Sequence, residues 1–276
     1  MKRSDFLGFG GLPASEHINQ QQAYDYLISL GFGNGELHQA RQAILNDRDT
    51  DQVAVPLTGK ACDFCFKRLM GGEYEKLRDD RERCIRCSRT KLASEEQFIY
   101  EYERVVRNME LIFGISIPPV REVQMVNAKQ IAKNTNEEFS PTSDVDARVL
   151  GYATNSAKGS SLFIENGSPR MAAISTMAHE LTHIWQYSAW KMSDIEKHYG
   201  KKYVSLIYEG MAMWAQIQYL IAIKEFDFAR DLMNETIQRQ DIYGIGFNTF
   251  ASQYSLQMDG EVGFDSPFHS DKPLGS

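Results

Sequence analysis

Apolar residues along this 276-residue chain recur mostly every three or four positions, the spacing of one face of an α-helix. Gly33, Asn34 and Gly35 interrupt the first of these patterns, so residues 19–47 predict a helical hairpin. We expect this hairpin to dock or pack, and a ubiquitin-binding helical domain is the less favoured alternative, because no third helix follows before Pro56. Further helices are predicted at 95–114, 201–222, 227–240 and 241–255.

A second pattern, in which β-branched and aromatic residues alternate or cluster, predicts strands at 120–126, 147–153 and 160–165. The polar segment 134–144 between them predicts a loop. Helices surrounding a small sheet predict an α+β fold.

Ser168 and Pro169 predict the start of another helix. We expect the serine hydroxyl to accept a backbone N–H and the proline to occupy the first turn. This helix contains MAHELTHIWQ, the stretch with most chemical interest in the chain. The helix at 201–222 is so apolar that we expect it to be buried.

Composition narrows the class of protein. No run of about 18 apolar residues could span a bilayer, and the N-terminal segment lacks the continuous apolar core of a secretory signal. We therefore expect a cytoplasmic protein with no membrane partner. The net charge of −7 argues against a general binder of nucleic acid.

All four cysteines lie in a locally basic segment, where residues 60–91 hold ten Lys or Arg against six Asp or Glu. Cys62 and Cys65 form one CxxC pair, and an 18-residue spacer separates them from the pair Cys84 and Cys87. Each pair can present two thiolates to one ion, which predicts a closed structural zinc site. Disulfides are the alternative, and redox catalysis lacks a βα context.

Basic side chains in this segment present a further choice. They could contact nucleic acid, remain solvated, or form a face on which a protein partner docks, and we favour protein docking over nucleic acid. The residues concerned are Lys67, Arg68, Arg83, Arg86 and Arg89.

The motif HExxH places two histidines on one helical face. His179 and His183 are four residues apart, so their imidazoles can meet at a common metal ion. Glu180 follows the first histidine and is placed to act on water as a general base.

A third ligand is predicted at Glu209, 26 residues after His183, within the apolar stretch YEGMAMW. A carboxylate in such surroundings needs a partner because an unpaired buried charge is costly, and zinc would supply it. The alternative is a pair of hydrogen-bonded core histidines with Glu209 in an unrelated ion pair. The metal interpretation predicts a catalytic zinc with one position open for water.

Other parts of a peptidase site are less specified. An oxyanion-stabilising residue is expected among Tyr208, Tyr219, Tyr243, Tyr254 and His198. Trp185 and Trp214 are expected to be packing residues. Strand 160–165 could pair with an extended substrate through a free edge, or be an ordinary core strand.

The cysteine pairs, the segment FIYEYERVVRNMELIFGI, HELTHIWQ, EGMAMW and YGIGF together resemble a known family. This family comprises the LIM-domain-bearing zinc peptidases of the DA-one type, first known as plant organ-size regulators, and their shorter bacterial relatives. The resemblance covers about residues 60–250. It implies a gluzincin-like endopeptidase of intracellular proteins, with a partner-binding role for the cysteine segment.

Two departures limit what the resemblance implies. A full LIM domain binds two zinc ions, whereas this chain has one cysteine quartet, and no ubiquitin-interacting helix is evident, so ubiquitin control is not carried over. We expect a tail and helical hairpin at residues 1–58, followed by a treble-clef or LIM-like zinc knuckle at 59–92. A zincin-like metallopeptidase domain is expected at 93–258 and a flexible tail at 259–276.

The sequence thus predicts a zinc endopeptidase that holds one catalytic and one structural zinc ion. A protein or peptide would be its substrate. A non-catalytic module that recruits a partner through the knuckle and hairpin is the main alternative, and the intact Glu180 argues against it. A nucleic-acid-binding regulator is the third, and the acidic chain argues against that.

Overall fold

The computed structural model describes residues 62–65, 67, 69, 74–78, 81–135, 150–258, 264–270 and 274. The helical hairpin predicted at 19–47 lies outside these residues. The described residues up to Ser188 belong to one compact unit, and those from Ala189 onward belong to a second. The expected boundary at residue 92 falls inside the first unit, which contains both the cysteine knuckle and the sheet that follows it.

The first unit begins with the cysteine knuckle, which is small. Strands β1 (Tyr74–Lys76) and β2 (Glu82–Cys84) pair antiparallel, and the short helix α3 (Ile85–Arg89) follows. Each strand has only three residues, too few to bury a core of their own. The knuckle must therefore take its stability from other interactions.

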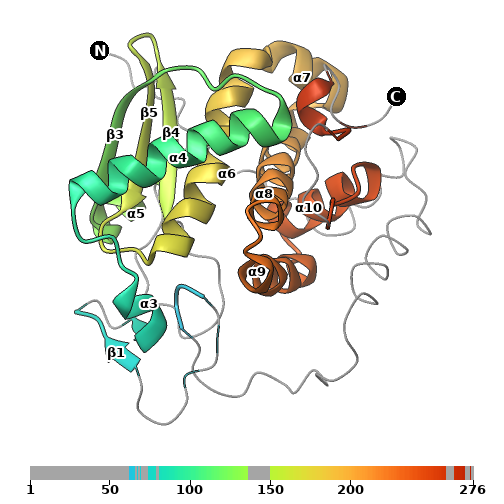
Figure 1. Cartoon of the computed structure of the whole chain (residues 1–276). Helices are drawn as coiled ribbons and strands as arrows, with labels where there is room; N and C mark the ends of the chain where they lie inside the picture. The colour runs from blue at the N-terminus through green and yellow to red at the C-terminus, as the bar shows by residue number, and fades with distance from the viewer. Residues whose placement is uncertain are drawn as a thin grey trace, which may run out of the picture. The chain divides into compact units, whose positions relative to one another are not determined.

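Helix α4 (Glu95–Phe113) confirms the helix predicted at 95–114. The Ser94 hydroxyl accepts a hydrogen bond from the Gln97 N–H at 3.2 Å, which caps the start of the helix. Gly114 ends it in the left-handed conformation at φ 63°, which glycine adopts without strain. Figure 1 shows α4 crossing beside the three-stranded sheet.

The sheet contains β3 (Val120–Val126), β4 (Gly151–Ser156) and β5 (Gly159–Glu165) in the order β3-β5-β4. Strand β5 runs parallel to β3 and antiparallel to β4. The prediction that a substrate pairs with strand 160–165 is therefore wrong: both edges of β5 already carry ladder hydrogen bonds. Helix α5 (Ala128–Thr135) follows β3 and was not predicted, although Ala128, Ile131 and Ala132 have the spacing of one helical face.

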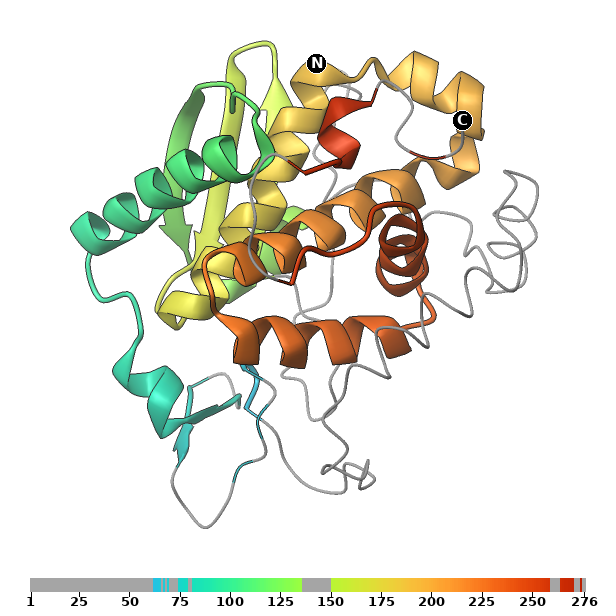
Figure 2. The same ribbon diagram turned by 45° about the vertical axis from the view of Figure 1, so that its right-hand side comes forward.

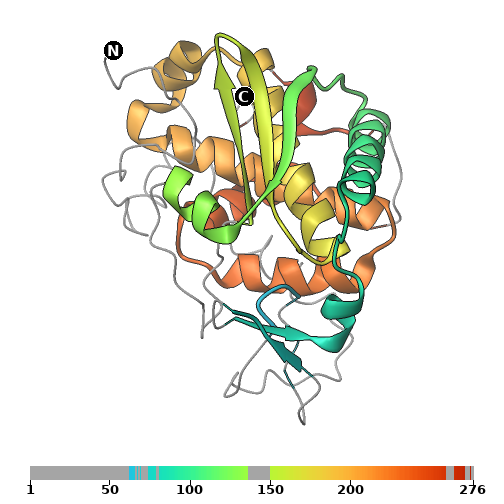
Figure 3. The ribbon, with the colours of Figure 1, turned by 90° about the vertical axis from the view of Figure 1, so that its left-hand side faces the viewer.

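Helix α6 (Arg170–Ala189) runs along the sheet, as Figure 3 shows, and every residue from Ala172 to Gln186 is buried. A Cβ on Gly151 of β4 would lie 2.7 Å from Cγ2 of Thr176, so the glycine lets strand and helix approach closely. The predicted Ser168 cap is wrong. The Ser168 hydroxyl has no hydrogen-bond partner among the described residues, and the Arg170 N–H donates instead to Thr90 O at 2.8 Å.

The second unit is helical (Figure 2), and its helices confirm those predicted after residue 200. Helix α7 was not predicted. The elements are α7 (Met192–Tyr199), the short 3-10 helix η2 (Lys201–Tyr203), α8 (Val204–Ala222), α9 (Phe226–Gln238), α10 (Ile242–Gln253) and η3 (Pro267–His269). Within the described part of the chain, no helix is long and apolar enough to cross a membrane.

Helices α8 and α10 approach closely at a pair of glycines. A Cβ built on Gly210 of α8 would lie 2.6 Å from the Gly246 backbone, and one on Gly246 would lie 2.7 Å from the Leu206 carbonyl oxygen. Atoms cannot approach to these distances, so both positions require hydrogen in place of a side chain. This contact gives a physical reason for Gly210 in EGMAMW and for Gly246 in YGIGF.

The described residues after Gly260, which are 264–270 and 274, differ from the flexible tail expected at 259–276. Phe268 is buried, and Leu274 is fully buried with its N–H and carbonyl oxygen both hydrogen-bonded to the Tyr199 hydroxyl, at 3.0 and 2.8 Å. Burial raises the pKa of Tyr199 to about 12, so the hydroxyl keeps its proton as a donor. The polar residues around them gave no indication that Phe268 and Leu274 are buried.

We predict that Gly210→Ala destabilises the protein by about 1–3 kcal/mol, because the new methyl group overpacks the contact with Gly246. Helix propensity alone would favour alanine by about 0.8–1 kcal/mol. Unfolding in urea, followed by circular dichroism, distinguishes the two. A more stable variant would contradict the close contact.

Candidate metal centres

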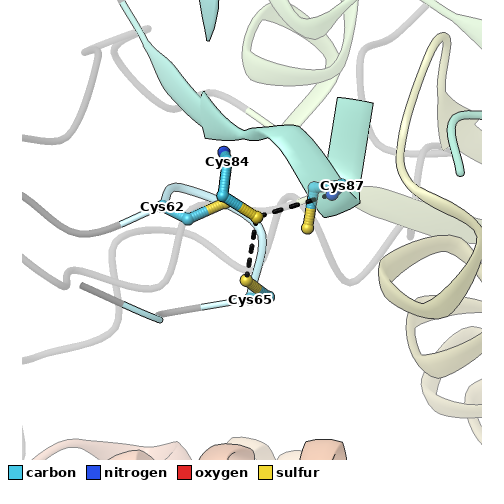
Figure 4. A group of neighbouring side chains, drawn as sticks. All are labelled: Cys62, Cys65, Cys84 and Cys87. Atoms are coloured by element: carbon cyan, nitrogen blue, oxygen red, sulfur yellow. Dashed lines mark hydrogen bonds between the residues drawn. The ribbon is translucent and has the colours of Figure 1, made fainter. Parts of the chain in front are cut away.

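The four cysteines come together from the two CxxC segments. Cys62 and Cys65 lie on a turn closed by the hydrogen bond from Cys62 N to Lys67 O at 2.9 Å, Cys84 ends β2, and Cys87 belongs to α3. One ligand atom from each cysteine lies within 4.8 Å of the others. Figure 4 shows the side chains directed toward one another.

Backbone N–H groups also point at the sulfur atoms. Cys84 N donates to the Cys62 sulfur at 3.3 Å, and Cys87 N donates to the Cys84 sulfur at 3.4 Å. Such bonds stabilise negative charge on sulfur. They therefore favour thiolates, the form that binds metals.

The thiols change one another's pKa. Hydrogen bonds from Cys65 and Cys87 lower the pKa of Cys62 to about 2. The hydrogen bond to Cys62 raises the pKa of Cys65 to about 12 and also raises that of Cys87. Ionisation of Cys62 thus disfavours ionisation of Cys65 and Cys87, and a cation among the sulfurs would offset that repulsion.

Sulfur spacing provides a test of fit to zinc. The sulfurs of Cys65 and Cys84 are 3.7 Å apart. Two thiolates of a tetrahedral zinc at about 2.3 Å would be about 3.8 Å apart. All four residues are free thiols rather than disulfides. The quartet can therefore bind a metal ion, and zinc fits it.

Arg83, one of the basic residues expected on a docking or solvated surface, is buried. Arg83 is 4 % exposed, donates to Gly167 O at 2.9 Å and pairs with Glu75 at 2.8 Å. Lys67, Arg86 and Arg89 are exposed, and Arg68 lies outside the described residues. Arg83 is thus a structural residue of the first unit.

The second candidate centre begins with the imidazoles of His179 and His183 on α6. Their Nε2 atoms are 3.1 Å apart, and both side chains are buried. Nitrogens bound to one tetrahedral zinc at about 2.05 Å would be about 3.3 Å apart, so the pair fits a shared ion. A direct N–H···N hydrogen bond fits the same distance, and that is the alternative of core histidines.

Gln186 orients His183, a role that the sequence analysis missed. Its Oε1 lies 2.8 Å from Nδ1 of His183, and the glutamine is fully buried. Because an amide oxygen only accepts, the proton sits on Nδ1 and the lone pair of Nε2 remains available to a metal. A buried glutamine three residues after the second histidine was the available signal.

Glu180 and Glu209 are both buried, at 7 % and 6 % exposure. Glu209 precedes Gly210 on α8. His179, His183 and Glu209 form a group whose ligand atoms all lie within 4.8 Å of one another. This group too can hold a metal ion, and a carboxylate beside two imidazoles is a donor set that zinc accepts.

The five candidates for an oxyanion-stabilising residue belong to the second unit, and their surroundings differ. Tyr208 is 1 % exposed, and burial raises its pKa to about 12, so it remains a hydrogen-bond donor. Tyr219 is fully buried, Tyr254 packs against Trp214, and Arg239 lies over the Tyr243 ring. His198 is exposed. None of these contacts selects one candidate. Trp185 and Trp214 are both buried, as the expected packing role requires.

No known family model, curated protein or solved structure matches this chain. The residues and their geometry therefore carry the functional argument.

We predict that the purified protein binds about two zinc ions per chain. Cys84→Ser should lose one ion by breaking the quartet, and His179→Ala should lose the other by removing an imidazole. Elemental analysis measures both. A single ion per wild-type chain, retained in His179→Ala, would leave the alternative of core histidines.

We further predict that Gln186→Leu weakens zinc binding at the histidine group by about 10–100-fold, since the ring of His183 loses its orienting acceptor. Gln186→Glu, which retains an acceptor oxygen, should recover much of the affinity. Competition with a chromophoric chelator measures the change. Equal loss in both variants would indicate a packing role instead.

Proposed function

We propose that this protein is a zinc-dependent endopeptidase. In this proposal His179, His183 and Glu209 bind the catalytic zinc, and Glu180 is the general base. The observation that carries it is the close approach of two imidazoles and a carboxylate, all buried, with a further carboxylate next to the first histidine. The resemblance to the DA-one type peptidases supports the same assignment.

A zinc ion held there would polarise a peptide carbonyl and lower the pKa of water to about 7. The residues of the chain do the remaining work. The Glu180 carboxylate accepts a proton from the attacking water and delivers it to the nitrogen of the leaving amine, so one group serves as base and then as acid. Its burial keeps bulk water from competing for that proton.

Histidine orientation supports the proposal at a second point. With its proton fixed on Nδ1 by Gln186, His183 offers Nε2 toward the side on which His179 also offers Nε2. Three protein ligands leave one position of a tetrahedral ion open for water, as a catalytic site requires. The four thiolates of the quartet leave none, so we assign the quartet a structural zinc.

A protein-docking role for the cysteine knuckle is a second candidate. Tyr74 and Ile85 are 40 % and 43 % exposed there, next to the exposed Arg86. Large apolar side chains beside a cation suit a protein partner better than a polyphosphate. This role is compatible with peptidase activity and would select substrates.

We predict that Glu180→Gln retains both zinc ions and cleaves an unfolded protein substrate at least about a hundredfold more slowly, because the amide cannot accept the proton. Gel analysis of casein digestion measures the rate. Glu96→Gln, which makes the same substitution at an exposed glutamate of α4, is the control and should cleave normally. Unchanged cleavage by Glu180→Gln would falsify the base assignment.

A further inference from the structure

A buried ion pair connects the cysteine knuckle with the end of the sheet. Arg81 Nη2 lies 2.6 Å from Glu165 Oε1, with side-chain exposures of 4 % and 2 %. Glu165 is the last residue of β5, five positions before α6 begins. The pair therefore attaches the knuckle to the segment that leads into the helix carrying HExxH.

Arg83 adds a second attachment at the same place. It donates to the carbonyl oxygen of Gly167, two residues beyond Glu165. Both guanidinium groups lie over the ring of Phe64, with Cζ 5.0 Å from its centroid for Arg81 and 5.8 Å for Arg83. Phe64 lies between Cys62 and Cys65, so the turn that carries two metal ligands positions both arginines.

The other CxxC segment is connected to α6 through the backbone. Immediately after α3, which contains Cys87, the carbonyl oxygen of Thr90 accepts from Arg170 N at 2.8 Å. Leu92 N donates to Ser168 O at 3.0 Å, and Lys91 forms a β-bridge with Pro169. The start of α6 is thus held from both halves of the quartet.

The shape of the knuckle in turn depends on the quartet. Asp63 and Glu82 exchange hydrogen bonds, from Asp63 N to Glu82 O at 3.0 Å and from Glu82 N to Asp63 Oδ2 at 2.6 Å. Beyond these bonds, two three-residue strands supply little stability. A cation shared by the four sulfurs would therefore fix the positions from which Arg81 and Arg83 reach the sheet.

We propose that the cysteine knuckle braces the metal-binding helix: a metal ion in the quartet holds Arg81 and Arg83 in place, and through them the start of α6. The arginines are positioning residues. His179 lies nine residues beyond Arg170, about 13 Å along a rigid helix, so the orientation of the helix start is transmitted to the histidines. The proposal rests on metal binding by the quartet, and on the proposed function only for its effect on the second metal.

The test is amide hydrogen exchange, measured by mass spectrometry on the full chain. We expect peptides covering residues 168–178 to exchange about tenfold faster or more in Arg81→Met than in wild type, while the quartet keeps its zinc. Glu165→Gln should show the same change from the other side of the ion pair. Cys84→Ser should show it together with loss of protection at 81–91.

Arg86→Met is the matched control, because Arg86 is an exposed arginine of the same knuckle and its loss should leave α6 unchanged. If residues 168–178 exchange in Arg81→Met as slowly as in wild type, the proposed brace is wrong. This outcome decides the question even if Cys84→Ser unfolds the whole chain. His179→Ala separates this result from the proposed function: it removes the second metal and the activity but leaves the effect of Arg81→Met in place.

A second readout follows the histidine group. Chelator competition should show zinc held there at least about tenfold more weakly in Arg81→Met than in Arg86→Met. Faster exchange with unchanged affinity would confine the brace to stability and overturn its effect on the metal.

Discussion

Helix α6 buries its side chains on all sides from Ala172 to Gln186, and three of those side chains are ionisable. This burial is the constraint on which the first unit depends, since an ionisable group removed from water requires a specific partner or loses its charge. Two imidazoles 3.1 Å apart meet that requirement by a shared proton or a shared metal ion. The carboxylate of Glu209 favours the metal, because it offers a third ligand atom to an ion shared by the two imidazoles.

The contacts described around the candidate metal-binding residues mainly set the orientation of side chains and helices. Gln186 decides which nitrogen of His183 carries the proton, and the glycine pair at the crossing of α8 and α10 fixes the turn on which Glu209 stands. The Arg81 ion pair does the same for the start of α6. Breaking a buried pair of this kind typically costs about 3–5 kcal/mol, because the remaining charge has no partner. Small polar contacts therefore have large effects on the geometry of the site.

These contacts make the cysteine knuckle a structural part of the first unit. Its sequence suggests a separate module with a basic surface, yet it belongs to the same compact unit as α6, and Arg83 is buried. A four-thiolate site with three-residue strands has little core of its own, so its binding energy serves as folding energy. Contacts with the loop that precedes α6 extend that stabilisation to the rest of the unit. Tyr74 and Ile85 of the knuckle are exposed.

The sequence by itself determined what depends on neighbours within a few residues. The spacing of His179 and His183 sets their imidazoles on one helical face, each CxxC presents two sulfurs, and Ser94 with Gly114 delimits α4, because local backbone geometry is fixed by local residues. The apolar stretch around Glu209 predicted that this carboxylate is a metal ligand, but not how close it lies to the two histidines.

Tertiary structure decided what depends on residues far apart in the chain. Only the fold shows that β5 is the central strand, that Arg83 is turned inward to Gly167, and that Thr90 takes the place of a Ser168 cap. Each of these features pairs groups that are distant in the sequence. The sequence shows which hydrogen-bond donors and acceptors exist, but the packing of the whole chain decides which of them pair.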